Sequence, residues 1–118
     1  MKKIAAVLAA LMLSFAFSNP AFAYGAIAVD DEVGDDEPGY GFVTGEDTAD
    51  IAKSKAMKEC RAQGNKNCKV VVWFKTCGAY ASSKKHYGYG YGANKAIAQK
   101  NALEMCGSNC KVQIAECE

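Results

Sequence analysis

The sequence predicts an α+β domain of two strand-strand-helix-strand repeats with pseudo-two-fold symmetry, whose helices pack on antiparallel sheet and which three disulfides hold together. The main observation is a repeat of five residues at a spacing of 46 positions, in which Ile51, Ala52, Ala56, Met57 and Cys60 recur as Ile97, Ala98, Ala102, Leu103 and Cys106. The tetrapeptide Asn-Cys-Lys-Val also occurs twice, at 67–70 and 109–112. One such unit cannot bury its own apolar face, whereas two packed together can.

The first repeat, about 24–77, is predicted to hold two short strands, a helix and a long strand. Strands are expected at 25–29 and 40–44, joined by a loop with the breakers Gly34, Pro38 and Gly39. Thr48 is expected to cap a helix that runs to about residue 62 and buries a face of small residues, Ala52, Ala56 and Cys60. The run at 69–76 is apolar on both faces, which predicts a central strand with Trp73 in the core.

The second repeat, about 78–118, follows the same plan. Residues 78–81 and 87–91 take the places of the two short strands. Asn94 is expected to cap a helix that ends near residue 105, and the last strand is predicted at 111–117. The loop before this last strand is four residues shorter than its counterpart in the first repeat.

The N-terminus, residues 1–23, has the pattern of a secretory signal peptide. Lys2 and Lys3 precede an apolar stretch at 4–17, and the small-x-small sequence 21–23 follows Pro20. The alternative is a retained membrane anchor, but the apolar stretch is shorter than the ~20 residues that a spanning helix needs. We therefore expect cleavage before Tyr24, a periplasmic or secreted location, and no membrane span in the mature protein.

The mature chain, residues 24–118, is short enough to form a single domain. Without Lys2 and Lys3, 12 of the 14 basic residues remain, against 13 acidic residues. This near balance of charge argues against nucleic acid as the main partner. The acidic residues are unevenly placed, because six of them form a candidate acidic loop: Asp30, Asp31, Glu32, Asp35, Asp36 and Glu37.

Six cysteines in a short exported chain predict three disulfides. Cys68 and Cys77 bound one extended segment about 30 Å long, and Cys110 and Cys117 bound another of about 23 Å, so neither pair can meet. These exclusions leave ten of the 15 pairings that six cysteines allow. The internal symmetry favours Cys60–Cys68 and Cys106–Cys110 within the units, and Cys77–Cys117 as a link between the two units.

The mature sequence resembles a family known as domain of unknown function 4189. In the first repeat the resemblance lies in Tyr24-Gly-Ala-Ile-Ala, in Tyr40-Gly-Phe, in the helix that ends at Cys60 and in the segment 67–72. In the second repeat it lies in the corresponding pattern with Cys106, Cys110 and Cys117. The resemblance implies an exported, disulfide-bonded, non-enzymatic bacterial domain. It supplies no catalytic residues to transfer.

Catalytic and metal sites have weak support in the sequence. His86 lies near Ser82 and Ser83, but no nucleophile motif surrounds them, and a polar residue at the start of a strand is the favoured interpretation of His86. The cysteines are better explained as bridges than as zinc ligands, and no cofactor is expected. The acidic loop has the carboxylates that calcium binds, yet its spacing does not match an EF-hand, so a solvated loop is favoured.

The alternating tyrosines and glycines at 87–92 are the main surface candidate. In a strand, Tyr87, Tyr89 and Tyr91 share one face and the glycines share the other. An exposed row would form an aromatic platform beside Lys84 and Lys85, suited to acidic ligands. The favoured interpretation is the opposite one, in which the tyrosines are the core face under the second helix, because aromatic residues of small domains are usually buried.

These patterns lead to three hypotheses of function. The first is an exported bacterial binding or interaction module that contacts a protein or glycan in the envelope or outside the cell, for example as an inhibitor of an envelope or host lytic enzyme. The second is a small secreted hydrolase that uses His86 with Ser82 or Ser83. The third is a purely structural envelope protein.

Overall fold

The computed structural model describes residues 23–32 and 38–118. The fold is α+β, as predicted, and its elements in chain order are β1 (Tyr24–Asp30), β2 (Gly39–Glu46), α2 (Ala49–Ala62), β3 (Lys69–Phe74), β4 (Cys77–Ser82), β5 (Tyr87–Gly92), α3 (Lys95–Cys106) and β6 (Lys111–Cys117). The predicted signal peptide, apart from its last residue, lies outside the described residues. Asp35, Asp36 and Glu37 of the candidate acidic loop also lie outside them.

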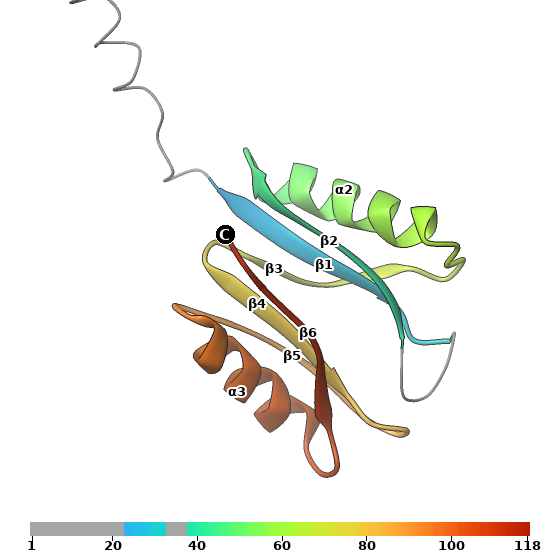
Figure 1. The fold of residues 1–118 in the computed structure, drawn as a ribbon, viewed down its shortest axis with the longest axis vertical. Coiled ribbons are helices and arrows are strands. Elements are labelled where there is room, and N and C mark those ends of the chain that lie inside the picture. The colour runs from blue at the N-terminus through green and yellow to red at the C-terminus, as the bar shows by residue number, and fades with distance from the viewer. Residues whose placement is uncertain (1–22, 33–37) are drawn as a thin grey trace, which may run out of the picture.

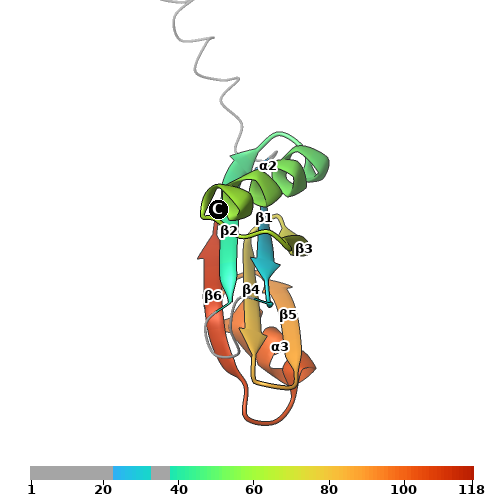
Figure 2. The same ribbon diagram turned by 90° about the vertical axis from the view of Figure 1, so that its right-hand side faces the viewer.

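The elements form four layers, in the order α2, first sheet, second sheet and α3 (Figure 1). The first sheet has the strand order β2-β1-β3 and the second β5-β4-β6, and every pairing is antiparallel. The two sheets face each other, with one helix on the outer side of each (Figures 1 and 2). Each half has the chain order strand, strand, helix, strand, while an exact relation between the halves by a two-fold axis stays a prediction.

Successive side chains of each strand point to opposite faces of its sheet, so one set lies between the sheets and the other lies under a helix. In β1, Ile27 and Val29 belong to the core between the sheets, whereas Ala26 and Ala28 pack against α2. The larger side chains therefore lie between the sheets, and small ones lie under the helices. Ala52, Ala56 and Cys60 of α2 are fully buried, as the sequence predicted. The equivalent layer under α3 is made of alanine and cysteine: Cys77, Ala79, Ala81, Ala98, Ala102 and Cys106.

The small residues allow the helices to lie directly on the strands. Gly88 and Gly90 of β5 are buried under α3, and a Cβ atom on either would overlap backbone atoms of the helix. Gly41 of β2 has the same relation to α2 at Cys60. Glycine is therefore required at these positions for the close approach of helix and strand.

Both helix starts agree with the sequence. The Thr48 side chain accepts a hydrogen bond from the Ile51 backbone N–H at 3.1 Å, and the Asn94 side chain accepts one from Ile97 N–H at 2.9 Å. Each cap satisfies one of the backbone donors that a helix leaves unpaired at its N-terminus.

The prediction for β3 was wrong in one respect. The strand lies at the edge of the first sheet, where it pairs with β1, and is not a central strand covered on both faces. Its apolar run is nevertheless explained, because Val72 and Phe74 fill the core between the sheets and Val70 packs under α2. Trp73 is 43% exposed, so its predicted place in the core was also wrong.

The structure contains the three disulfides that the internal repeat favoured, Cys60–Cys68, Cys77–Cys117 and Cys106–Cys110. Two of them join the end of a helix to the start of the next strand. Cys77, however, is the first residue of β4 and lies opposite Cys117 of β6. This bridge is therefore internal to the second sheet, and the expectation that it links the two units was wrong.

Candidate binding site

The tyrosines of β5 face the space between the sheets but are not buried there. Tyr89 lies opposite Tyr80 of β4 in the strand pairing and shares its side of the sheet. Tyr87, Tyr89 and Tyr91 are 50%, 37% and 64% exposed. The prediction that they form the core face under the second helix was wrong, because Gly88 and Gly90 take that side and let α3 approach.

A cleft of about 510 Å³ lies along the edges of β3 and β5, where the two sheets open to solvent. Tyr89 and Tyr91 line it from the second sheet, and Val71, Trp73 and Lys75 line it from the first. We call this site the aromatic cleft. It lies between the edge strands of two separate sheets, so its shape depends on how the sheets are packed together. Trp73 pairs with Ala26, which packs against α2, so the Trp73 ring lies on the α2 side of the first sheet, and the rings that face the cleft are those of Tyr89 and Tyr91.

Lysines lie over aromatic rings on the α2 side of the first sheet, at the strand edge next to the cleft. The Lys53 ammonium is 5.9 Å from the centre of the Trp73 ring, and Lys75 is 5.7 Å from the ring of Tyr24. Tyr24 and Trp73 in turn lie 6.2 Å apart between ring centres. Such cation–π contacts hold the rings in place at about 0.5–1 kcal/mol each at exposed sites, and they leave the surface both aromatic and positively charged.

The strand edges beside the cleft are poorly suited to pairing with another strand. On β5, the Tyr89 backbone N–H donates to the Met105 sulfur at 3.4 Å, and the Tyr91 carbonyl accepts from the Asn101 side chain at 3.0 Å. On β3, the register with β1 shifts at Val71. Covered backbone groups and register shifts both discourage edge-to-edge pairing. A ligand of the cleft is therefore expected to contact side chains.

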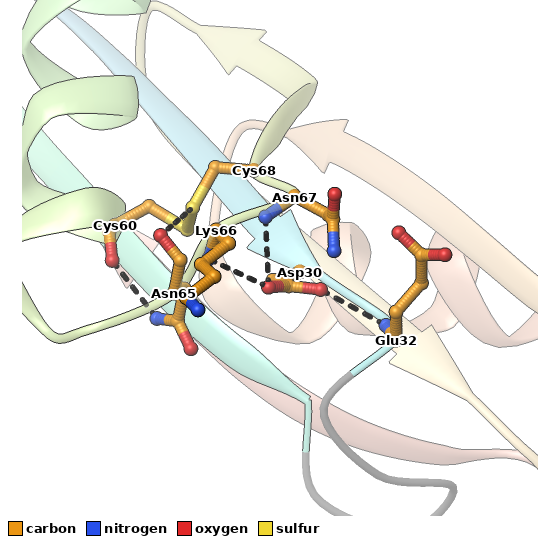
Figure 3. The surroundings of a disulfide bond; sticks show 7 residues. All are labelled: Asp30, Glu32, Cys60, Asn65, Lys66, Asn67 and Cys68. Carbon is orange, nitrogen blue, oxygen red and sulfur yellow. Dashed lines mark hydrogen bonds between the residues drawn. A yellow bond between two sulfur atoms is a disulfide. The ribbon is translucent and has the colours of Figure 1, made fainter.

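Asp30 is not part of a solvated loop, contrary to the sequence interpretation. It is the last residue of β1, is 1% exposed, and accepts backbone hydrogen bonds from Asn67 at 3.0 Å, Lys66 at 3.2 Å and Glu32 at 3.0 Å. Figure 3 shows this carboxylate beside the Cys60–Cys68 bridge, where the segment between α2 and β3 folds over it. The Asn67 N–H contributes most to lowering the pKa of Asp30, the Glu32 and Lys66 N–H groups act in the same direction, and burial opposes them.

Asp30 is expected to make the protein sensitive to acid. Since its pKa is lower in the folded state, the unfolded chain binds more protons, and the free energy of unfolding should fall as the pH drops from about 4 through the folded-state pKa. Urea unfolding between pH 2 and pH 7 measures this effect. Asp30→Asn should be less stable at pH 7 and should show a flatter acid limb. Asp50→Asn, which changes an exposed carboxylate, is the control, and an equal change in both variants would contradict the assignment.

The other described members of the acidic loop are exposed. Asp31 forms an ion pair with Lys69 at 3.1 Å, and Lys69 also lies 5.2 Å from the centre of the Tyr87 ring. Within residues 23–32 and 38–118 no group of three potential metal-ligating side chains is found. Calcium binding by the whole loop stays the less favoured alternative of the sequence analysis, because half of its carboxylates lie outside these ranges.

The structure places His86, Ser82 and Ser83 together at the hairpin between β4 and β5. The Ser83 hydroxyl accepts hydrogen bonds from the backbone N–H groups of His86 at 3.1 Å and Lys85 at 3.4 Å, and Ser82 Oγ accepts one from Gln113 Nε2 at 3.1 Å. The Ser83 hydroxyl thus holds the hairpin in shape, whereas the Ser82 hydroxyl links β4 to Gln113 of β6. His86 is exposed and directly precedes β5, as the strand-start interpretation expected.

One buried residue of this region was missed by the sequence interpretation. Tyr80 of β4 is 1% exposed, and its ring stacks at 6.3 Å on Tyr87. Its hydroxyl has no hydrogen-bond partner among the described residues. Burial, with smaller contributions from Asp31 and Tyr87, raises the pKa of Tyr80 to about 12. No pattern in the sequence distinguishes Tyr80 as a buried polar residue. The alternation of side chains in β4 would also fit a strand whose face towards the first sheet is wholly apolar.

Together, these features define a small disulfide-bonded α+β domain with a surface cleft of aromatic and lysine side chains. The chain belongs to the family described as Domain of unknown function (DUF4189), which matches residues 24–117. It is 34% identical over 90 residues to Protein Rv1269c and Protein MT1307 of Mycobacterium tuberculosis and to Protein Mb1300c of Mycobacterium bovis. The matches cover 76% of this chain and 66% of each relative. No solved structure matches the chain.

The described residues, 23–32 and 38–118, include no helix that is long and apolar enough to cross a membrane. Disulfides persist in oxidising compartments, so the three bridges are compatible with a place outside the cytoplasm.

Proposed function

We propose that this protein is an exported binding module of the periplasm or the extracellular space, and that its ligand site is the aromatic cleft. The observation that supports this most is the exposure of Tyr89 and Tyr91 in a cleft between the edge strands of two sheets. A small domain gains stability by burying its aromatic rings, so rings left in a solvent-filled cleft favour a role in recognition.

The chemistry of the cleft favours a glycan or a protein surface as ligand. Tyrosine and tryptophan offer large rigid faces and polar tips, which suit sugar rings and protein side chains equally. The lysines around the rings favour ligands with negative charge. An inhibitor of an envelope or host lytic enzyme is one concrete form of such a module.

The three disulfides would serve this function by keeping the cleft in its binding shape. Two bridges hold the helix ends against the strands, and the third joins β4 to β6 in the sheet that carries the tyrosines. A rigid site loses less conformational entropy on binding, which raises affinity.

The proposal predicts that Tyr89→Ser/Tyr91→Ser keeps the fold and loses the ligand. Exposed side chains contribute little to stability, so the free energy of unfolding should change by less than about 1 kcal/mol. Binding should weaken at least tenfold, since aromatic anchors commonly contribute about 2 kcal/mol or more. The probes are purified peptidoglycan, tested by cosedimentation, and hen lysozyme, tested by titration calorimetry.

The matched control is Tyr40→Ser, which removes an exposed tyrosine from β2. Binding of either probe that depends on Tyr89 and Tyr91, but not on Tyr40, supports the proposal. Unfolding of the double variant would mean that the tyrosines have a core role, and binding that is unchanged in the double variant would place the ligand elsewhere. Either result overturns the assignment of the cleft.

The hydrolase hypothesis has less support. His86 lies beside Ser82 and Ser83, but the Ser83 hydroxyl accepts hydrogen bonds from the hairpin backbone and the Ser82 hydroxyl accepts one from Gln113 of β6. A nucleophile is expected to be hydrogen-bonded to its base, which is in turn oriented by a third group. His86→Ala separates the hypotheses, because a hydrolase would lose its activity while binding in the aromatic cleft would continue.

A further inference from the structure

A second pocket, smaller than the aromatic cleft, lies at the other end of the tyrosine row. Its volume is about 130 Å³, and it lies beneath the hairpin that joins β4 to β5. Tyr80, Ser82 and Tyr87 line it together with the hairpin residues Ser83, Lys84, Lys85 and His86, and Asp31 and Pro38 complete it. A pocket of this size holds a small polar group and not a whole sugar ring or side-chain cluster.

The hydroxyl of Tyr80 is the feature that points to a ligand. It is buried, belongs to a residue that lines this pocket, and has no hydrogen-bond partner among the described residues. A buried hydroxyl without a partner is destabilising, so such groups in folded proteins call for an explanation. Because the pKa of Tyr80 is raised to about 12, the hydroxyl is protonated at neutral pH and can donate a hydrogen bond.

The charges around the pocket favour an anion over a cation. Lys84 and Lys85 are exposed, and no carboxylate of the described chain lies within 4.0 Å of either ammonium group. Asp31 lines the same pocket, but its carboxylate is paired with Lys69 at 3.1 Å. The described lining residues therefore supply two unpaired positive charges and one paired negative charge.

The hairpin holds these groups in a fixed shape. The Ser83 N–H donates to the His86 carbonyl at 2.8 Å, and the Ser83 hydroxyl accepts hydrogen bonds from the backbone of Lys85 and His86. Ser83 therefore both donates and accepts hydrogen bonds across the turn that carries the two lysines, and these bonds fix the shape of the turn. A preorganised loop binds an anion at a lower entropic cost than a mobile one.

We propose that this pocket binds an oxyanion group, namely a carboxylate, sulfate or phosphate, with the Tyr80 hydroxyl as hydrogen-bond donor and Lys84 and Lys85 as the source of positive charge. Tyr87, Tyr89 and Tyr91 lead along β5 from this pocket towards the aromatic cleft. If the proposed function holds, the oxyanion belongs to the same ligand, which makes that ligand an acidic glycan. The binding of a free oxyanion does not depend on the proposed function.

The test is an NMR titration of the oxidised protein with glucuronate, inorganic sulfate and inorganic phosphate, with glucose as the uncharged control. The anions should shift the backbone amides of residues 82–87 and raise the melting temperature, and glucose should do neither. Tyr80→Phe preserves the ring and removes the donor, so it should weaken anion binding at least tenfold, as expected for a hydrogen bond to a charged group. The comparison of glucuronate with sulfate and phosphate identifies which oxyanion the pocket prefers.

Two further variants complete the test. Lys84→Gln/Lys85→Gln changes only exposed side chains and should also weaken anion binding about tenfold, whereas Lys58→Gln/Lys100→Gln, on the helices, should change it less than twofold. Tyr91→Phe is the control for Tyr80→Phe, since it removes an exposed hydroxyl outside the pocket. In the absence of anion, Tyr80→Phe should melt at the same or a higher temperature than the unaltered protein, because it removes an unpaired polar group.

Three results would overturn the proposal: no amide shift at residues 82–87 with any of the anions, equal binding by Tyr80→Phe and the unaltered protein, or shifts of the same amides by Ca²⁺ in place of the anions. Failure of the proposed function looks different. In that case Tyr89→Ser/Tyr91→Ser would not affect binding of peptidoglycan or lysozyme, while the small anions would still bind at Tyr80.

Discussion

Cys77→Ala/Cys117→Ala is expected to lower the free energy of unfolding by about 4 kcal/mol, the largest loss among the three disulfides. The bridge joins residues 40 positions apart, and removing it gives the unfolded chain much more conformational freedom than removing a short bridge. For a domain of this size such a loss is a large share of the total stability. Equilibrium unfolding in urea, with the slope fitted separately for each protein, measures the difference.

The two shorter bridges are the internal controls. Cys106–Cys110 closes a separation of four and Cys60–Cys68 a separation of eight, so their removal should lower the unfolding free energy by only about 2–3 kcal/mol each. A ranking in which the shortest bridge contributes most would contradict this explanation. It would show that local packing at the helix ends, and not the entropy of the unfolded chain, sets the contribution of each disulfide.

Gly90→Ala is expected to destabilise the protein by about 1–3 kcal/mol, and Gly88→Ala/Gly90→Ala by more. A Cβ at Gly90 would overlap the Ala98 carbonyl oxygen and the Ala102 backbone nitrogen, and neither atom can move unless α3 moves as a whole. The shift of α3 would also disturb the side chains that cover the β5 edge. Thermal and urea unfolding measure the loss, and amide shifts across α3 should report the displacement.

Two comparisons make this prediction specific to the close contact. Gly64→Ala places a side chain where φ is +94° and nothing lies within 4 Å, so it should show only the strain of a left-handed backbone, about 1 kcal/mol. Ala102→Gly should not rescue Gly88→Ala, because the Cβ of residue 88 would meet backbone atoms of α3 and not the Ala102 methyl group. Rescue would show that the clash involves side chains, contrary to the structure.

The tyrosine row shows how far a periodic pattern can be interpreted. The alternation of residues 87–92 established that the three tyrosines share one face of a strand. It could not establish which face is inside, because both glycine and tyrosine can lie under a helix. The structure decided the matter through α3, whose backbone lies so close to β5 that only Gly88 and Gly90 fit between them.

Trp73 and Asp30 were misjudged for related reasons. The run around Trp73 is apolar on both faces, which fits a central strand, but the chain forms two three-stranded sheets and leaves β3 at an edge. Asp30 begins a run of acidic residues, which fits a solvated loop. Only the folded chain brings the backbone N–H groups of Lys66 and Asn67, more than 30 positions away, onto its carboxylate.

The sequence by itself determined the class of fold and the strands and helices with their caps, and its repeat favoured the three disulfide pairs among the ten pairings left open. These features depend on short-range rules, namely the period of a strand or helix, the chemistry of a cap and the reach of a disulfide. The tertiary structure alone decided which strands are edges, which tyrosines are exposed, and that the buried Tyr80 hydroxyl has no hydrogen-bond partner among the described residues. Those properties depend on how two sheets pack face to face. Packing brings together residues that are far apart in the chain, and no short sequence pattern indicates which of them will meet.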